Sequence, residues 1–323
     1  MLNALTIDVE DYFQVEAFAS RINYNEWDNY PCRIKQNTQK ILDILDDYQI
    51  KATFFCLGWI AKRSPSLIKN IAQRGHEVAS HGYAHQPVYK QSPDIFMQDI
   101  RKTKQILEDI IGQPVIGYRA PTYSITQKTL WALEILAEEG YKYDSSIFPI
   151  KHDLYGIPNA PRFPFNVHTL KRSNVLTCKR ANVQTCKRSN VQTCKRSNVL
   201  TCKRSNVQTF FEFPLTTLRI LNINIPIAGG GYFRVFPYIF IKNALRHINL
   251  KEKQPFVFYL HPWELDPEQP RINHLPWRSR FRHYVNLRKT EGKFRKLLSD
   301  FRFSTVLKVL KQHNSKLGTH EGY

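Results

Sequence analysis

The chain of 323 residues has little cysteine and no long apolar run, and both absences restrict what it can be. Four of its six cysteines fall in one internal repeat, which leaves only Cys32 and Cys56 elsewhere. This is too few for a disulfide-stabilised scaffold. A membrane-spanning helix needs about 20 consecutive apolar residues, and no such stretch occurs.

The amino-terminus also lacks the basic region and apolar core of an export signal. A strand-like segment, Leu5 to Val9, begins almost at once. Together with the few cysteines, this predicts a cytoplasmic protein with reduced thiols, placed either free or at the inner face of the membrane.

Acidic residues are scarce relative to basic ones, and the formal net charge is +20. Such an excess is typical of proteins that bind anions. However, the segment 171–209 contains five Lys-Arg pairs and no acid, so it supplies +10 and leaves +10 for everything else. We therefore predict no specific nucleic-acid partner.

That segment is an octapeptide repeat, with near-identical copies that begin at Lys171, Lys179, Lys187, Lys195 and Lys203. It is either a basic arm, a cysteine-based metal array or a dispensable insertion. Cysteines eight residues apart lack the close pairing of zinc sites. Ordering each residue costs about 1–2 kcal/mol, and few apolar side chains offset this, so we expect a poorly ordered insertion with Phe165 and Phe211 close together at its base.

Elsewhere, apolar β-rich runs alternate with helical patterns, which indicates an α/β fold with a parallel sheet. Strands are expected at 5–9, 52–57, 76–80, 115–118, 141–147 and 255–260, and helices at 38–48, 66–74, 95–111 and 129–139. Polar residues recur at the carboxyl ends of these strands: Asp8, Glu10, His81, Arg119, Asp144 and His261. An α/β barrel assembles its active site at that end, so the pattern predicts an enzyme.

His81 and His85 are separated by one turn, a spacing that lets two imidazoles reach one divalent cation. The acidic run Asp8-Val9-Glu10-Asp11 can supply a carboxylate ligand. Three protein ligands leave positions open for water, which is typical of a catalytic metal. The spacing alone is also found in ordinary surface or core histidines.

The segment 271–311 is basic and aromatic, and a helix is expected near 291–301. It is interpreted either as a surface that faces a polysaccharide or a membrane, or as a helix whose apolar face packs on the barrel.

In order, Asp8-Val9-Glu10-Asp11, His81-Gly82-Tyr83-Ala84-His85, Arg119-Ala120-Pro121, Asp144-Ser145-Ser146 and Leu260-His261-Pro262 resemble the motifs of the NodB-homology polysaccharide deacetylases, carbohydrate esterase family 4. The sequences around these motifs are similar to those of one branch of the family, which is found in exopolysaccharide loci with PEP-CTERM/exosortase systems. That branch is matched by Val9-Glu10-Asp11-Tyr12-Phe13-Gln14, by Gly229-Gly230-Gly231-Tyr232-Phe233-Arg234, and by the segment from Tyr259 to Asp266. The resemblance covers Leu5 to about Phe303 without the repeat.

The resemblance implies a distorted (β/α)7-type barrel over residues 1–303, with the insertion at 171–209 and a basic tail at 304–323. It implies a hydrolase that removes N-acetyl groups from N-acetylhexosamine units, in exopolysaccharide biosynthesis. The substrate would be an N-acetylated polysaccharide or a lipid-linked oligosaccharide. One divalent metal ion is implied, zinc first, with cobalt or another divalent ion as alternatives.

The resemblance also implies roles for individual residues. Glu10, His81 and His85 would hold the metal, with Asp11 as an alternative to Glu10, and Asp8 would be the general base. His261 would be the general acid, tuned by Asp144. Arg119 would line the groove and hold Asp8 ionised, while the substrate and oxyanion residues would be Thr122, Tyr123 and Trp263.

Amide hydrolysis requires these functions in any scaffold, because it needs an activated water, a stabilised oxyanion and a proton for the leaving nitrogen. Two alternatives remain open at the level of sequence. One is an allantoinase-like hydrolase of cyclic amides on the same fold. The other is a catalytically weak protein whose basic segments bind a polyanion.

Overall fold

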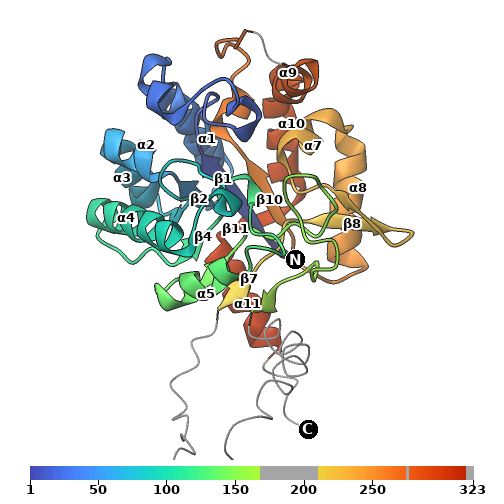
Figure 1. The fold of residues 1–323 in the computed structure, drawn as a ribbon. Coiled ribbons are helices and arrows are strands. Elements are labelled where there is room, and N and C mark those ends of the chain that lie inside the picture. The colour runs from blue at the N-terminus through green and yellow to red at the C-terminus, as the bar shows by residue number, and fades with distance from the viewer. Residues whose placement is uncertain (168–209, 274–275, 318–323) are drawn as a thin grey trace, which may run out of the picture.

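A curled, mostly parallel sheet forms the centre of the molecule in the computed structural model, which describes residues 1–167, 210–273 and 276–317 (Figure 1). The sheet has nine strands in the order β10-β1-β2-β3-β4-β5-β7-β6, with β11 beside β1. Their bounds are β1 (Leu2–Val9), β2 (Thr53–Cys56), β3 (Glu77–Ser80), β4 (Gly117–Tyr118), β5 (Tyr143–Asp144), β6 (Phe165–Asn166), β7 (Phe211–Glu212), β10 (Val257–Leu260) and β11 (Arg302–Ser304).

Helices surround this sheet (Figure 1). They are α1 (Ile34–Asp47), α2 (Gly58–Arg63), α3 (Pro65–Gln73), α4 (Pro93–Ile111), α5 (Trp131–Glu138), α7 (Gly230–Val235), α8 (Tyr238–Leu250), α9 (Trp277–Tyr284), α10 (Leu287–Asp300) and α11 (Val306–Leu317). Short 3-10 helices follow several strands, among them η1 (Glu16–Phe18), η4 (Pro121–Tyr123) and η5 (Pro262–Leu265). A separate hairpin joins β8 (Thr217–Ile220) to β9 (Ile223–Pro226).

The predicted α/β class and the parallel sheet are confirmed. Strand β1 lies at the centre, and its residues from Asn3 to Val9 are buried on both faces, as expected for a parallel strand covered by helices. The predicted distorted barrel is a curled half-barrel, because in the described residues the ladder runs from β10 to β6 without closing. Thr216 bridges part of the gap: its Oγ1 accepts from the N–H of Val257 at 2.8 Å and donates to the carbonyl of that residue at 2.7 Å.

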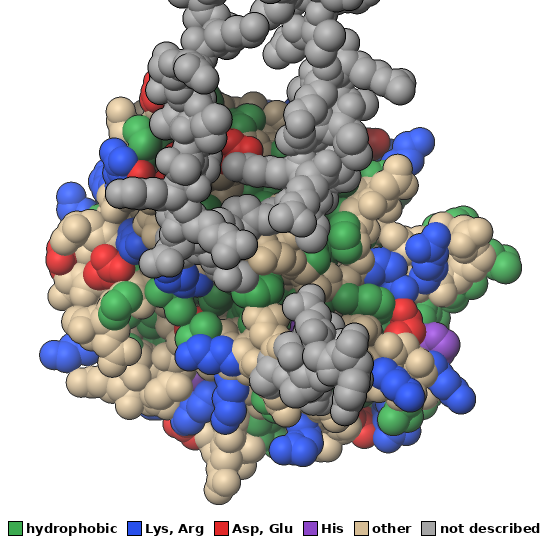
Figure 2. Space-filling view, turned by 90° about the horizontal axis from the view of Figure 1, so that it is seen from below, with side chains coloured by type: hydrophobic (Ala, Val, Ile, Leu, Met, Phe, Trp, Pro, Cys, Tyr) green, Lys and Arg blue, Asp and Glu red, His purple; other side chains and the backbone are tan. Residues whose placement is uncertain are grey.

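Strands β6 and β7 form an antiparallel pair in which Phe165 faces Glu212 and Asn166 faces Phe211. The expected closeness of Phe165 and Phe211 is therefore found. The repeat at 171–209 and its predicted disorder lie outside the described residues. In the view from below, the described surface carries lysine and arginine side chains scattered among acidic and apolar ones (Figure 2).

The carboxyl-terminal region packs against the rest of the fold, whereas a separate basic tail was expected from residue 304. Strand β11 pairs with β1, and α11 buries Val306, Val309 and Leu310. The boundary expected at 303/304 therefore falls inside packed structure. The helix expected near 291–301 is α10, which buries Phe294 and Leu297 while its lysines stay outside the core. None of the helices in the described ranges is long and apolar enough to cross a membrane.

Candidate active site

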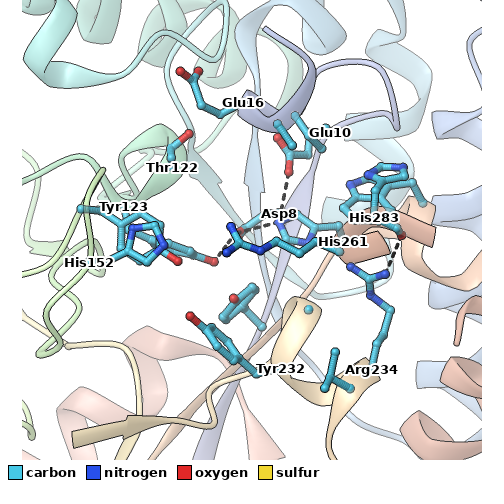
Figure 3. Close-up of a pocket in the computed structure, with 18 of the residues that line it drawn as sticks. Asp8, Glu10, Glu16, Thr122, Tyr123, His152, Tyr232, Arg234, His261 and His283 are labelled. Carbon is cyan, nitrogen blue, oxygen red and sulfur yellow. Dashed lines mark hydrogen bonds and ion pairs between the residues drawn. The ribbon is translucent and has the colours of Figure 1, made fainter. Parts of the chain in front are cut away.

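The ends of strands β1, β3 and β10 meet at one pocket of about 730 Å³ (Figure 3). Strands β1, β3 and β10 end immediately before Glu10, His81 and His261, and these three residues line the pocket with Asp8 and His85. The structure thus brings together five of the residues singled out in the sequence. It does so because parallel strands present their carboxyl ends on the same side of a sheet.

Glu10, His81 and His85 offer a set of metal-ligand atoms that all lie within 4.8 Å of one another. Oε2 of Glu10 is 2.7 Å from Nε2 of His85, yet this buried oxygen has no hydrogen-bond partner among the described residues. Nδ1 of His81 lies 2.8 Å from the carbonyl oxygen of Arg119, which directs Nε2 toward the pocket. Burial lowers the pKa of His81 to about 4, so its ring is neutral and has a lone pair to give. This donor set fits a divalent cation such as Zn²⁺.

Asp11 is directed elsewhere. Its Oδ2 accepts the backbone N–H groups of Arg33 at 2.6 Å and Ile34 at 2.9 Å, at the start of α1. Free N–H groups at a helix start attract a carboxylate, and Asp11 supplies it from another part of the chain. The geometry therefore favours Glu10 over Asp11 as the ligand.

The loop that carries the two histidines has an unusual backbone. Gly82 has φ +72° and His85 has φ +50°, in the left-handed region where a non-glycine residue is uncommon. Asp99 of α4 holds the loop by accepting the N–H of Tyr83 at 3.0 Å. Burial raises the pKa of Asp99 to about 6.

Asp8 is held by Arg119, which is fully buried behind it and does not line the pocket. Nη1 of Arg119 donates to Oδ1 of Asp8 at 2.6 Å and to Oγ1 of Thr6 at 2.7 Å. The remaining guanidinium donors bind Ser145, through its carbonyl and its hydroxyl, both at 2.9 Å. The expected contact with Asp8 is present, while the expected place of Arg119 on the groove wall is not.

Thr122 and Tyr123 follow β4 with φ of +57° and +53°, two consecutive strained residues beside the pocket. The N–H of Tyr123 donates to the carbonyl of Ala120, whereas no acceptor for the N–H of Thr122 is found among the described residues. The hydroxyl of Thr122 is also buried without a hydrogen-bond partner there. The side chain of Tyr123 serves another purpose, because its hydroxyl donates to Oδ2 of Asp8 at 3.3 Å.

His261 lies among three carboxylates. Its Nε2 is 3.0 Å from Oε1 of Glu10 and 3.8 Å from Oδ2 of Asp8, and its Nδ1 is 3.1 Å from Oε2 of Glu264. Burial alone would lower the pKa of His261, but Glu10 and Glu264 together raise it to about 10.

The carboxylate that contacts Nδ1 of His261 thus belongs to Glu264, not to Asp144 as the resemblance implied. Oδ1 of Asp144 accepts from the hydroxyl of Ser146, which in turn accepts the N–H of Ala120 at 2.7 Å. Burial raises the pKa of both Asp144 and its neighbour Glu212, on the paired strand β7. Asp144 therefore supports the loop after β4 from behind the site.

A buried network continues outward from Glu264. Arg234 of α7 donates from Nε to Oε1 of Glu264 at 2.7 Å and from Nη1 to the carbonyl of His283. Trp263 is 4% exposed and stacks between the rings of His261 and His283, with centroid distances of 5.3 and 4.1 Å. Trp263, expected at the substrate, lines the pocket beside His261.

Sequence reasoning did not assign roles to Glu264, Arg234 or His283. Glu264 had a local signal: it lies three residues after His261 in a capping box, so its side chain accepts the N–H of His261. Arg234 ends the motif Gly229–Arg234 but was given no role, and His283 had no signal, since each reaches the site from a distant part of the chain.

Residues 20–143 match the family model described as "Polysaccharide deacetylase", and residues 184–311 match "Domain of unknown function (DUF3473)". The first match includes His81, His85 and Arg119. The matches support a NodB-homology polysaccharide deacetylase. Asp8, Glu10 and His261 lie outside the matched deacetylase range, so the structure alone connects them to it. The narrower likeness to the PEP-CTERM/exosortase branch stays a prediction.

Two curated relatives are deacetylases by name. The chain is 39% identical over 98 residues to the peptidoglycan-N-acetylglucosamine deacetylase of Bacillus cereus, covering 30% of this chain and 36% of that protein. It is 30% identical over 112 residues to the peptidoglycan deacetylase of Helicobacter pylori, covering 33% and 36%. The chain thus spans about a third of the length of these relatives.

Among solved structures, the fold is similar to that of a presumed polysaccharide deacetylase from Mycobacterium smegmatis. The TM-score is 0.55 at 18% identity, and the superposition covers 97% of this chain and 90% of the other. This likeness shows the fold over nearly the whole chain, including the part beyond the deacetylase match.

Proposed function

We propose that this protein is a metal-dependent hydrolase that removes N-acetyl groups from N-acetylhexosamine units of a polysaccharide. One observation carries the proposal: the ligand set Glu10, His81 and His85 shares a pocket with Asp8, which Arg119 holds from behind, and with His261. These three parts are what amide hydrolysis requires, and parallel strands bring them to the same side of the sheet.

A divalent ion held by Glu10, His81 and His85 would lower the pKa of water toward about 7 and polarise the acetyl carbonyl. Zinc suits two imidazoles and one carboxylate best, and cobalt is an expected substitute. Neutral His81, oriented by the carbonyl of Arg119, is ready to act as a ligand without first losing a proton.

Asp8 is the proposed general base. It faces the pocket beside the ligand set, where it can accept the proton of the attacking water. Arg119 and Tyr123 hold its two oxygens, which fixes the direction of the carboxylate. This arrangement limits the reorganisation of the base during reaction.

His261 is the proposed general acid. Because its pKa is raised to about 10, it carries a proton at neutral pH and can deliver it from Nε2 to the departing amine. Glu264 binds the opposite ring nitrogen and keeps the ring in place.

Thr122 is the proposed oxyanion donor. Its N–H is without an acceptor in the described structure, and its backbone is held in a strained conformation next to the pocket. One such donor contributes on the order of 2.7–4 kcal/mol to transition-state stabilisation.

The wider role is proposed on the resemblance and on the relatives. The name of the Bacillus cereus relative supports a glycan that carries N-acetylglucosamine. We place the reaction in exopolysaccharide biosynthesis, in the cytoplasm or at the inner face of the membrane, where a polymer or a lipid-linked oligosaccharide would be the substrate.

The test is acetate release from N-acetylglucosamine oligomers by metal-stripped and zinc-reconstituted protein. Activity should vanish on chelation and return with zinc or cobalt. Asp8→Asn should lower the rate, and His261→Ala should lower it and abolish the alkaline limb of the pH–rate profile, each with a loss of about 10²–10⁴-fold. Turnover of cyclic amides without metal, and none of the oligomers, would refute the proposal in favour of a cyclic-amide hydrolase.

A further inference from the structure

Helix α9 lines the outer part of the pocket with two aromatic and two basic side chains: Trp277, Arg278, Phe281 and Arg282. Trp277 is 73% exposed and Phe281 54% exposed, so this helix does not bury its aromatic face on the barrel. Within α9 only His283 is buried. The aromatic and basic surface expected in this region is therefore found at the pocket mouth.

Some charged side chains that line the pocket have ion-pair partners and others do not. Asp8 is paired with Arg119, and Glu16 is 2.7 Å from Nζ of Lys90. Glu10 belongs to the ligand set. Arg234, a third arginine of the lining, is paired with Glu264. Arg278 and Arg282, by contrast, have no ion-pair partner in the described part of the chain, so they give the mouth an uncompensated positive charge.

Across the pocket from α9 lies a second aromatic surface. The ring of His152 stacks on that of Tyr155, with centroids 3.9 Å apart and planes 10° apart. Burial lowers the pKa of His152, and the nearby charge of Arg282 lowers it further. Arg282, His152 and Tyr155 all line the same pocket, so one ligand in it can contact both the arginine and the aromatic pair.

We infer that the glycan substrate carries an anionic group, a carboxylate or a phosphate, that binds Arg278 and Arg282 while its sugar rings pack between α9 and the His152–Tyr155 pair. This inference rests on the proposed function and adds the charge of the substrate to it. Planar guanidinium groups bind both carboxylates and phosphates through paired N–H donors, so the two sources share one chemistry.

The experiment compares three N-acetylglucosamine oligosaccharides of equal length with zinc-loaded protein. One is neutral, one contains a neighbouring uronic acid, and one carries a terminal phosphate. We expect the anionic substrates to have a kcat/KM about three- to tenfold above the neutral one at low salt, with an advantage that shrinks as salt rises. The substrate with the larger advantage identifies the source of the charge.

Variants test whether Arg278 and Arg282 cause the preference for anionic substrates. The double variant Arg278→Gln/Arg282→Gln should bring the anionic-to-neutral ratio of kcat/KM toward one, mainly through KM. Arg280→Gln is the matched control, because Arg280 is exposed on the same helix but does not line the pocket. It should keep both the ratio and the basal activity.

Tryptophan fluorescence quenching measures binding of the same oligosaccharides without turnover. Charge-dependent binding without turnover would refute the proposed function and leave the inference standing. Equal kcat/KM and equal binding for neutral and anionic substrates would overturn the inference, as would an equal loss in Arg280→Gln. Binding to phosphatidylglycerol vesicles that depends on all three arginines, with no preference among oligosaccharides, would overturn it in favour of a lipid surface.

Discussion

Oε2 of Glu264 lies 3.1 Å from Nδ1 of His261 and 3.0 Å from its backbone nitrogen, while Oε1 is bound by Arg234. One fully buried carboxylate thus fixes the ring, the backbone and the charge of the proposed acid. Arg234 holds the pKa of Glu264 below its usual value against the effect of burial, so Glu264 stays ionised beside the histidine.

The first prediction concerns Glu264→Gln. The amide retains the shape but not the charge, so the pKa of His261 should fall from its raised value. Since the proton of the acid is then lost at lower pH, the alkaline limb of the kcat profile should move down, with kcat at pH 8 reduced on the order of 10–100-fold. Glu16→Gln, at a pocket carboxylate paired with Lys90, should leave that limb in place. An unmoved limb in Glu264→Gln would show that Glu264 does not tune the acid.

The second prediction separates the two acids that follow β1. Glu10→Gln, like His85→Ala, should lose both bound zinc and turnover, as measured by metal analysis after dialysis. Asp11→Asn should keep one zinc per chain but lower the free energy of unfolding by about 1–2 kcal/mol, because Asp11 caps α1. If Asp11→Asn loses the metal while Glu10→Gln keeps it, the ligand assignment is reversed.

The third prediction concerns the pH dependence of stability. The pKa of Asp99 is about 6 in the folded protein, above its unfolded value, so the folded state binds the extra proton and the contribution of Asp99 to stability declines as pH rises from about 4 to about 6. Asp99→Asn cannot ionise, yet its amide oxygen can still accept the N–H of Tyr83. The variant should match the wild type near pH 4 and be more stable by up to about 2 kcal/mol at pH 7.5. Urea unfolding at both pH values measures this, and a constant difference between the two would contradict it.

The fourth prediction concerns the octapeptide repeat. A Gly-Ser bridge that replaces 171–209 should preserve deacetylation and keep the melting temperature within about 3 °C, because β6 and β7 already pair at its base. Retention on a heparin-like column should fall, since +10 of the +20 net charge is removed. A version of equal length with serine in place of each Lys and Arg is the control, and it should lose the same retention. A bridged protein that fails to fold would make the segment part of the domain.

The alternation of strands and helices could be read from the sequence, because apolar periodicity reports which faces are buried. Some observed strands are shorter than expected: β5 covers only Tyr143–Asp144 of the run 141–147. There the chain leaves the ladder, and Ser145 and Ser146 turn their hydroxyls to Arg119 and Ala120. Apolar character does not reveal where a ladder stops.

At the site, the residues that follow strands could be identified from the sequence. Which carboxylate contacts which partner could not, because all carboxylates carry the same charge. Asp144 and Glu264 both lie near strand ends, and only the capping box after β10 brings one of them to His261. The role of Asp11 cannot be read from the sequence either, because the helix start that it caps lies 22 residues away. A local capping box decides the case of Glu264, whereas a contact with a distant segment decides that of Asp11, and composition encodes neither.

The pairing of β6 with β7 has a consequence for how this protein can change over generations. Both ends of the intervening chain are fixed side by side, so their separation does not depend on how many copies lie between them. Closing a flexible loop costs only about 0.6 kcal/mol more for each doubling of its length. If the segment is the dispensable insertion predicted from the sequence, whole octapeptides could be gained or lost without shifting the register of the sheet, and the number of copies would set the total charge without affecting the fold.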